Sequence, residues 1–363
     1  MVYINAYVRQ HFSPLNVLSD RAVQSKYRLP RVEIQRLVTL VSPHIQRATR
    51  CNFALSPEVQ LLAALRFYAV GSFLEVVGDG TGLSKASVSR SVAAVTPILL
   101  RHARTHIRMP TTRDEVRQVH RGFHAMAGIP RVIGVVDGTL IPIHNPSLVD
   151  PCWIGRKHYA AINTQVAVDH DGLITDIVAR WPGGTHDSFA WANSAVGQKA
   201  GRGEFGRSIF LGDSGYPLRS YLVTPITNPA TPQEERFNEA HTHTRTHIER
   251  VFGRWKSRYR CIHRSSGGLR LSPVKCCRVI VVTAMLHNMA VRVGADEPPP
   301  VDEDGETSED EAPNPAPRES RAALHQAGVQ TREELVNLLM SISPYPVTTS
   351  HQALISAPPY SQH

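Results

Sequence analysis

Apolar residues recur at helical spacing through the first third of the chain. In PEVQLLAALRFYAV, residues 57–70, they follow Ser56, a residue type that caps helix N-termini, and Pro57, which suits a first helical turn. The spacing continues on both sides of this segment, from about residue 15 to residue 128. We therefore predict a helical region over residues 1–128.

Short β-rich runs replace the helical pattern after residue 130. Five runs are expected to form strands, at residues 131–143, 160–168, 173–181, 208–213 and 221–226. DHDG, residues 169–172, joins the second run to the third and predicts a hairpin turn with Asp171 and Gly172 at its tip. Helical stretches follow at 239–260 and 272–292. The expected class is α+β, with an α/β domain over residues 129–292.

Residues 293–363 differ from the rest in composition. DEPPPVDEDGETSEDE, residues 296–311, holds nine of the 31 acids and no Lys or Arg, which leaves 40 − 22 = +18 for the remaining residues. This composition predicts an acidic, Pro-rich, disordered linker, and the basic remainder favours a polyanionic partner. After the linker, Thr331 and Glu334 have the spacing of a capping box and predict a short helix in a polar tail.

The composition also narrows the cellular setting. No run of eighteen apolar residues is present, the N-terminal residues lack the features of a secretory signal, and we expect no membrane partner. The five cysteines include no C-x-x-C pair, which argues against a disulfide framework and against a cysteine zinc site. A reducing compartment is expected.

Residues 71–95, GSFLEVVGDGTGLSKASVSRSVAAV, have the pattern of a helix-turn-helix. The first helix ends near Asp79, glycines follow, and the second helix begins near Ser84. Its inward positions are Val88, Val92 and Val95. Its polar positions carry Lys85, Ser87, Ser89 and Arg90, which are side chains that can reach phosphates and base edges. An ordinary helical hairpin is the alternative.

Two aspartates are associated with apolar strands. Asp137 lies within IGVVDGTLIPI, and Asp213 directly follows the run that ends at Gly212. Neither has a Lys or Arg nearby in sequence, and a buried carboxylate without compensation costs several kcal/mol, about 2 to 7 for polar groups in general. A divalent cation would compensate both, and Mg²⁺ is commonly bound through one or two carboxylates.

A third acid lies in the predicted helix TRTHIERVFGRWKSRYR, residues 244–260. Ile248, Phe252, Trp255 and Tyr259 form its apolar stripe, and Glu249 shares a neighbouring face with Arg245 and Lys256. The many arginines, including Arg254, suit phosphate contacts. A solvated helix with a surface pair between Glu249 and Arg245 is the alternative.

Four motifs in this order resemble the PIF/Harbinger class of DDE transposases and the host-domesticated nucleases derived from them. The motifs are VDGTLIPI around Asp137, GGTHDS around Asp187, GDSGYPL around Asp213 and IERVFGRWKSRY around Glu249. The similarity extends from about residue 50 to residue 292. It implies an RNase H-like core with one acid on the first strand, another after the fourth strand and Glu249 on a following helix.

The resemblance also implies the site. Asp137, Asp187, Asp213 and Glu249 would bind a divalent metal, Mg²⁺ or Mn²⁺, and Asp137, Asp213 and Glu249 would be catalytic. Asp187 could instead cap the helix that begins at this point. Candidate DNA contacts are Lys85, Ser87, Arg90, Arg245, Arg254 and Lys256.

Two functions are therefore expected from the sequence. The first is a metal-dependent DNA endonuclease, and the alternative is a catalytically silent DNA-binding or scaffold protein. The resemblance further implies DNA as a partner, dependence on a Myb-like DNA-binding protein, and location in the nucleus and also the cytoplasm.

Overall fold

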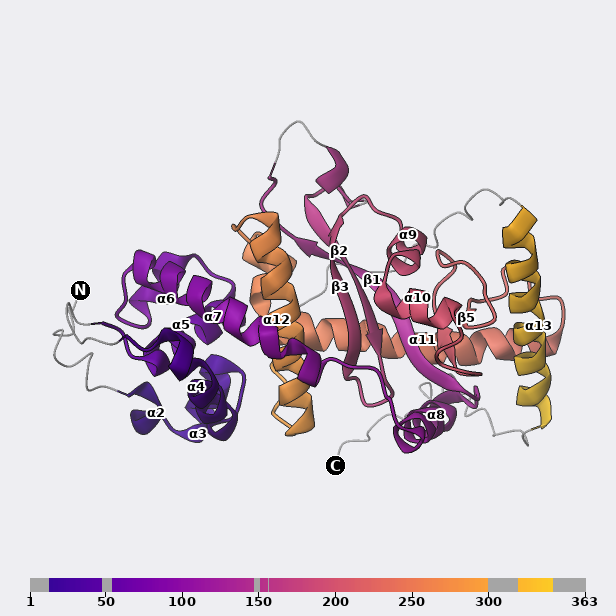
Figure 1. Cartoon of the computed structure of the whole chain (residues 1–363), viewed down its shortest axis with the longest axis horizontal. Coiled ribbons are helices and arrows are strands. Elements are labelled where there is room, and N and C mark those ends of the chain that lie inside the picture. Colours follow the sequence, from indigo (N-terminus) through magenta and orange to yellow (C-terminus); the bar gives the residue numbers. More distant parts are fainter. Residues whose placement is uncertain (1–12, 48–53, 147–150, 156, 300–318, 342–363) are drawn as a thin grey trace, which may run out of the picture.

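A five-stranded mixed sheet lies at the centre of the molecule (Figure 1). The computed structural model describes residues 13–47, 54–146, 151–155, 157–299 and 319–341. The strands are β1 (Val132–Pro142), β2 (Ala161–Val168), β3 (Ile174–Pro182), β4 (Ile209–Leu211) and β5 (Leu222–Val223). All five predicted strands are confirmed.

The sheet has the strand order β3-β2-β1-β4-β5. β1, β2 and β3 are antiparallel neighbours, whereas β4 runs parallel to β1 and β5 runs parallel to β4. Gly172 has a φ of 78°, and the Asp169 side chain accepts hydrogen bonds from the backbone N–H groups of Asp171 and Leu173, which confirms the predicted hairpin turn. This mixed sheet is compatible with the RNase H-like core that the resemblance implies.

Helices cover both faces of the sheet (Figure 1). Val136 of β1 belongs to a cluster with Trp191 of α9 (Asp187–Ala192) and Val196 of α10 (Ala195–Gly201). Its neighbour Val135 belongs to the larger core, which includes residues of α8 (Arg113–Ala127), α11 (Pro232–Arg258) and α12 (Pro273–Arg292). Since adjacent strand residues point to opposite faces, α9 and α10 cover one face and these three helices the other.

The predicted N-terminal region is all-α over the residues that the structure describes. Before α8 it contains α2 (Pro14–Val17), α3 (Asp20–Tyr27), α4 (Arg31–Ile45), α5 (Pro57–Val70), α6 (Leu74–Asp79) and α7 (Lys85–His106). Ser56 caps α5 as predicted, because its side chain accepts a hydrogen bond from the N–H of Val59. α7 packs against α12, and one continuous hydrophobic cluster includes both regions. The helical region and the sheet therefore share a core.

The segment predicted as a helix-turn-helix forms two helices joined by a short turn. α6 ends at Asp79, and Ser84 caps α7 by accepting a hydrogen bond from the N–H of Ser87. The inward positions Val88, Val92 and Val95 are buried. The local geometry agrees with the pattern, but an ordinary helical hairpin has the same features, so DNA binding by these helices stays a prediction.

The C-terminal helix corrects one prediction. α13 spans Glu319–Ser341, so Thr331 lies inside it, and the Thr331 hydroxyl donates to the carbonyl of Ala327. The capping box is therefore wrong, because helical residues precede Thr331 and α13 packs against α11 and β5 with Leu335 fully buried. Most of the acidic segment, residues 300–311, for which disorder was predicted, lies outside the described residues.

α12 is long and apolar enough to cross a membrane by length and composition alone. In the fold, however, 67% of the most apolar 18-residue stretch of α12 is buried inside the protein. A core helix accounts for this composition.

Candidate active site

Asp137 and Asp213 lie side by side at the parallel pair β1 and β4. Val135 pairs with Leu211, so each aspartate follows a paired residue by two positions. The Asp137 residue is 8% exposed, and the Asp213 carboxylate accepts a hydrogen bond from the N–H of Gly215 at 3.1 Å. Two acids far apart in the sequence are thus brought together on neighbouring strands in the interior of the sheet.

Asp187 joins them at the start of α9. A Cβ on Gly138 would lie 2.4 Å from Asp187 Oδ1, so the aspartate can approach β1 only because residue 138 is glycine. Asn163 of β2 donates from Nδ2 to Asp187 Oδ1 at 3.0 Å and to the carbonyl of Thr185 at 2.7 Å. The N-cap of α9 is His186, and Asp187 is the first helical residue. The predicted alternative, that Asp187 itself caps the helix, is therefore wrong.

The sequence patterns did not identify Asn163 as a site residue. The signal that could have identified it is a polar residue, 5% exposed in the structure, within the otherwise apolar run AAINTQVAV. Its amide fixes the carboxylate of Asp187, as residues behind metal ligands commonly do.

Glu249 lies in the middle of α11, and the side chain of Arg245 connects it to Asp137. The Arg245 guanidinium lies 3.0 Å from Glu249 Oε1, one turn along the helix, and 3.6 Å from Asp137 Oδ2. The pair between Glu249 and Arg245 that was predicted as the alternative does form. It is not an isolated surface pair, because the same guanidinium, 15% exposed, also faces Asp137.

The acids repel one another strongly enough to change the protonation of Asp137. Burial, which has the largest effect, and the neighbouring carboxylates of Asp213 and Asp187 together raise the pKa of Asp137 to about 8, against the opposing effect of Arg245. A carboxyl group that is costly to ionise in this way is a candidate for a site that binds a cation.

The donor set fits Mg²⁺ or Mn²⁺, since all four acids offer carboxylate oxygens and hard divalent cations prefer oxygen. Within the residues that the structure describes, no three His, Cys, Asp or Glu side chains lie close enough together to hold a metal ion. Arg245 instead provides the positive charge between Asp137 and Glu249. The metal-binding role of these acids remains a prediction.

The candidate DNA contacts fall into two groups. Lys85 and Arg90 are exposed and Ser87 is half-buried on α7, and Figure 1 shows the start of α7 far from β1. On α11, Arg245 joins the acids, and Arg254 pairs with Glu297 at 3.1 Å. Lys256 is only 3% exposed, so it is not retained among the proposed DNA contacts.

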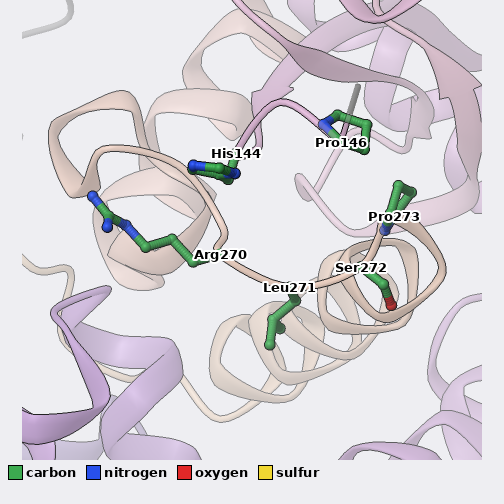
Figure 2. Close-up of a pocket in the computed structure, with 6 residues that line it drawn as sticks. All are labelled: His144, Pro146, Arg270, Leu271, Ser272 and Pro273. Carbon is green, nitrogen blue, oxygen red and sulfur yellow. The ribbon is translucent and has the colours of Figure 1, made fainter. Parts of the chain in front are cut away.

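Within the part of the chain that the structure describes, two cavities lie near β1 or the residues that follow it. The first, of about 100 Å³, borders Asp187 and is lined by Gly138, Leu140, Asn163, Gly183, Gly184, Thr185 and His186 as well. Figure 2 shows the second, of about 480 Å³, between the residues after β1 and the start of α12. Its lining is His144, Pro146, Arg270, Leu271, Ser272 and Pro273. This lining contains no carboxylate, so only the first cavity belongs to the acid site.

Comparison with known proteins identifies the family. Residues 136–288 match the family described as DDE superfamily endonuclease, and this range includes all four acids. No solved structure matches the chain.

Named relatives share most of their length with this chain. The proteins named "Putative nuclease HARBI1" from Bos taurus and Homo sapiens are 38% and 37% identical over 282 residues, which cover 78% of this chain and 81% of each relative. "Protein ALP1-like" from Arabidopsis thaliana is 27% identical over 298 residues, 75% of this chain and 71% of that protein. The sheet, the order of the four acids along the chain and these similarities lead to one assignment: the chain belongs to the DDE superfamily endonucleases, together with the Harbinger-derived nucleases.

Proposed function

We propose that this protein is a metal-dependent DNA endonuclease. The observation that carries the proposal is the buried carboxyl group of Asp137, with Asp213 and Asp187 close enough to raise its pKa and Glu249 on the facing helix. Buried acids that repel one another are retained when a bound cation compensates them. The relatives named as nucleases support DNA as the substrate.

In this proposal Asp137, Asp187, Asp213 and Glu249 hold Mg²⁺ or Mn²⁺, and Asp137, Asp213 and Glu249 are the catalytic residues. A bound divalent ion would polarise the phosphodiester and lower the pKa of the attacking water or 3′-hydroxyl. Gly138 leaves room for the Asp187 carboxylate, and Asn163 orients it. Arg245, which pairs with the acids in the metal-free protein, contacts the phosphate that is cleaved.

The remaining DNA contacts are proposed from charge and exposure. Arg254 extends the basic surface of α11, and Lys85, Ser87 and Arg90 of α7 hold DNA away from the point of cleavage. A Myb-like DNA-binding protein acts as a partner that supports recognition and nuclear entry, and the protein is located in the nucleus and also the cytoplasm.

A catalytically silent DNA-binding or scaffold protein is the second candidate. One observation favours it: the Arg245 guanidinium lies 3.6 Å from Asp137 and 3.0 Å from Glu249, so a side chain of the protein itself offsets part of the charge of these acids. The two candidates differ in whether the acids bind metal and in whether DNA is cut.

The deciding experiment is cleavage of supercoiled plasmid by the purified chain with Mg²⁺ or Mn²⁺, beside the variants Asp137→Asn, Asp213→Asn and Glu249→Gln. Asp171→Asn is the matched control, because Asp171 lies at the exposed β2–β3 turn with a side chain 58% exposed. Each site variant should retain DNA binding and lose cleavage by about a hundredfold or more.

Nicking that the three site variants abolish and Asp171→Asn preserves would establish the nuclease. DNA binding without cleavage by the wild type, at every metal concentration and with the partner protein added, would favour the silent protein. Cleavage that survives all three substitutions would remove these acids from the mechanism.

A further inference from the structure

Two aromatic rings and an arginine meet where the edge strand β3 ends beside α9. The ring centroids of Trp181 on β3 and Phe189 on α9 are 5.0 Å apart, with an interplanar angle of 75°. The guanidinium carbon of Arg180 lies 4.4 Å from the centroid of the Trp181 ring, and Arg180 donates to the carbonyl of Asn193 at 2.8 Å. Ring packing, a cation–π contact and a hydrogen bond therefore hold β3 and α9 together at this point.

The aromatic pair lies next to the acid site. Trp181 pairs with Asn163 across β2 and β3, and Asn163 donates to the carboxylate of Asp187 at 3.0 Å. Cross-strand partners point to the same face of a sheet, and neighbouring strands lie about 4.8 Å apart. Phe189 follows Asp187 by two residues on α9. The two rings thus lie beside the acid that begins this helix.

The Phe189 side chain is open to solvent. Phe189 is 50% exposed, whereas Trp181 is partly buried. Rings inclined at 75° do not stack on each other, so the contact with Trp181 occupies at most one face of the Phe189 ring. A single exposed apolar residue is common on protein surfaces. Phe189 differs because a second ring supports it and because it lies beside the acids.

An open aromatic ring next to a positive charge suits an unpaired nucleotide. Every base has a π face that stacks on an aromatic side chain. A base inside a duplex is covered on both faces by its neighbours, so it reaches a protein ring only after it leaves the stack. Arg180 is exposed, and the chain has a net charge of +9, which favours a nucleic acid over a protein surface as the ligand.

We propose that Phe189, supported by Trp181, stacks on an unpaired base of the DNA strand that is cut, within a few nucleotides of the scissile phosphate. A DNA strand advances about 3.4 Å per nucleotide in a duplex, so a strand with a phosphate at the acids brings a nearby base to the rings. The inference rests on the proposed function, which places the scissile phosphate at Asp187 and the other acids. The substrate class is then DNA with an unstacked base near the cut.

The first test compares two single-stranded oligonucleotides of about twelve nucleotides, one of thymidine and one with the same backbone but without bases. Fluorescence anisotropy measures the binding of each to the full chain in EDTA, so that no strand is cut. The wild type should bind the thymidine oligonucleotide about fivefold tighter or more, because one stacked base contributes at least this factor.

Three variants assign this preference. Phe189→Leu should lose it and keep its affinity for the oligonucleotide without bases, because leucine retains the apolar contact with Trp181 and has no ring face. Phe189→Tyr keeps the ring and should retain the preference. Leu324→Ala is the matched control, since Leu324 lies on α13 with 51% exposure, and it should bind both oligonucleotides as the wild type does.

Three results would overturn the proposal. The first is equal affinity of the wild type for the two oligonucleotides. The second is an equal loss on both oligonucleotides in Phe189→Leu, which would assign the ring to the packing of α9. The third is an unchanged preference in Phe189→Leu, which would leave the exposed ring to a protein partner.

The second test addresses the substrate class with two duplexes of equal length, one fully paired and one with a short internal mismatch. A mismatched base leaves the stack at a lower cost, so the wild type should bind the mismatched duplex about fivefold tighter or more, and Phe189→Leu should bind both alike. Equal binding of both duplexes by the wild type would overturn the proposal.

Both tests are made without divalent metal and without cleavage. A protein that fails to cut DNA can still show the base preference, and a protein that cuts DNA can lack it. Failure of this proposal is therefore distinguishable from failure of the nuclease proposal.

Discussion

The guanidinium of Arg245 lies 3.6 Å from the carboxylate of Asp137, and this contact joins two segments 108 residues apart in the sequence. The contact is longer than a good hydrogen bond, and burial with two neighbouring carboxylates keeps the pKa of Asp137 at about 8. Asp137 is therefore mostly protonated at neutral pH in the metal-free protein. Metal binding and proton binding compete for one group.

Proton release should accompany metal binding. At pH 7, below the pKa of about 8, binding of Mn²⁺ should release about one proton from Asp137, and at pH 9.5 it should release almost none. Calorimetry in two buffers with different ionisation enthalpies measures this number directly. Asp171→Asn should behave as the wild type, whereas equal proton release at both pH values would contradict the role of Asp137.

Asp137→Asn should stabilise the metal-free protein at high pH. The folded pKa of about 8 lies above the ordinary value of 3.8, so the folded state binds more protons and the free energy of unfolding falls as the pH rises from about 4 to 8. The amide removes this loss, on the order of a few kcal/mol at pH 8. Urea unfolding in EDTA at pH 5 and pH 8 measures the free energies of unfolding of the wild type and the variant. A variant that is less stable than the wild type at pH 8 would show that the ionised carboxylate stabilises the fold.

Gly138→Ala should damage the site more than the fold. Its Cβ would meet Asp187 Oδ1 at 2.4 Å and push that carboxylate away from Asp137. Affinity for Mn²⁺ should fall by about tenfold or more, as for other residues that position metal ligands. Gly80→Ala is the control, because the nearest atom to a Cβ there lies 3.7 Å away. Unchanged affinity in Gly138→Ala would separate Asp187 from the metal site.

Glu297→Gln should strengthen binding of DNA. Glu297 pairs with Arg254 at 3.1 Å, and both side chains are partly exposed, so the pair itself contributes little to stability. Without the acid, Arg254 is available to phosphate, and affinity for a duplex should rise about two- to fivefold at low salt and converge with the wild type at high salt. Fluorescence anisotropy measures this. Glu239→Gln carries the same charge change on exposed α11 surface, and an equal gain there would assign the effect to net charge alone.

Leu335→Ala should destabilise the protein by about 2 to 4 kcal/mol, because Leu335 is fully buried on α13. Leu324→Ala, on the same helix with 51% exposure, should change the free energy of unfolding by less than about 0.5 kcal/mol. Denaturant unfolding compares the two variants. Equal stabilities would mean that α13 contributes no core packing.

Local patterns in the sequence were sufficient for much of the secondary structure. Apolar periodicity and turn residues identified all five strands, the hairpin at Asp171 and Gly172, and the cap of α5 at Ser56, because each depends on neighbouring residues. The capping box at Thr331 failed, since residues before it are also helical and α13 is held by packing against α11 and β5.

The sequence also identified the four acids, each by its own motif, but not how they are arranged. Which charged residues surround Asp137 depends on the parallel register of β1 and β4 and on the helix that covers the sheet, so Asp213, which repels it, and Arg245, which compensates it, became its neighbours only in the folded chain. The same holds for Asn163, which lies behind Asp187 although 24 residues separate them in the sequence. Residue identity and local spacing therefore determined which groups this protein carries. Only tertiary packing, which controls burial and distance between charges, decided which of them act together.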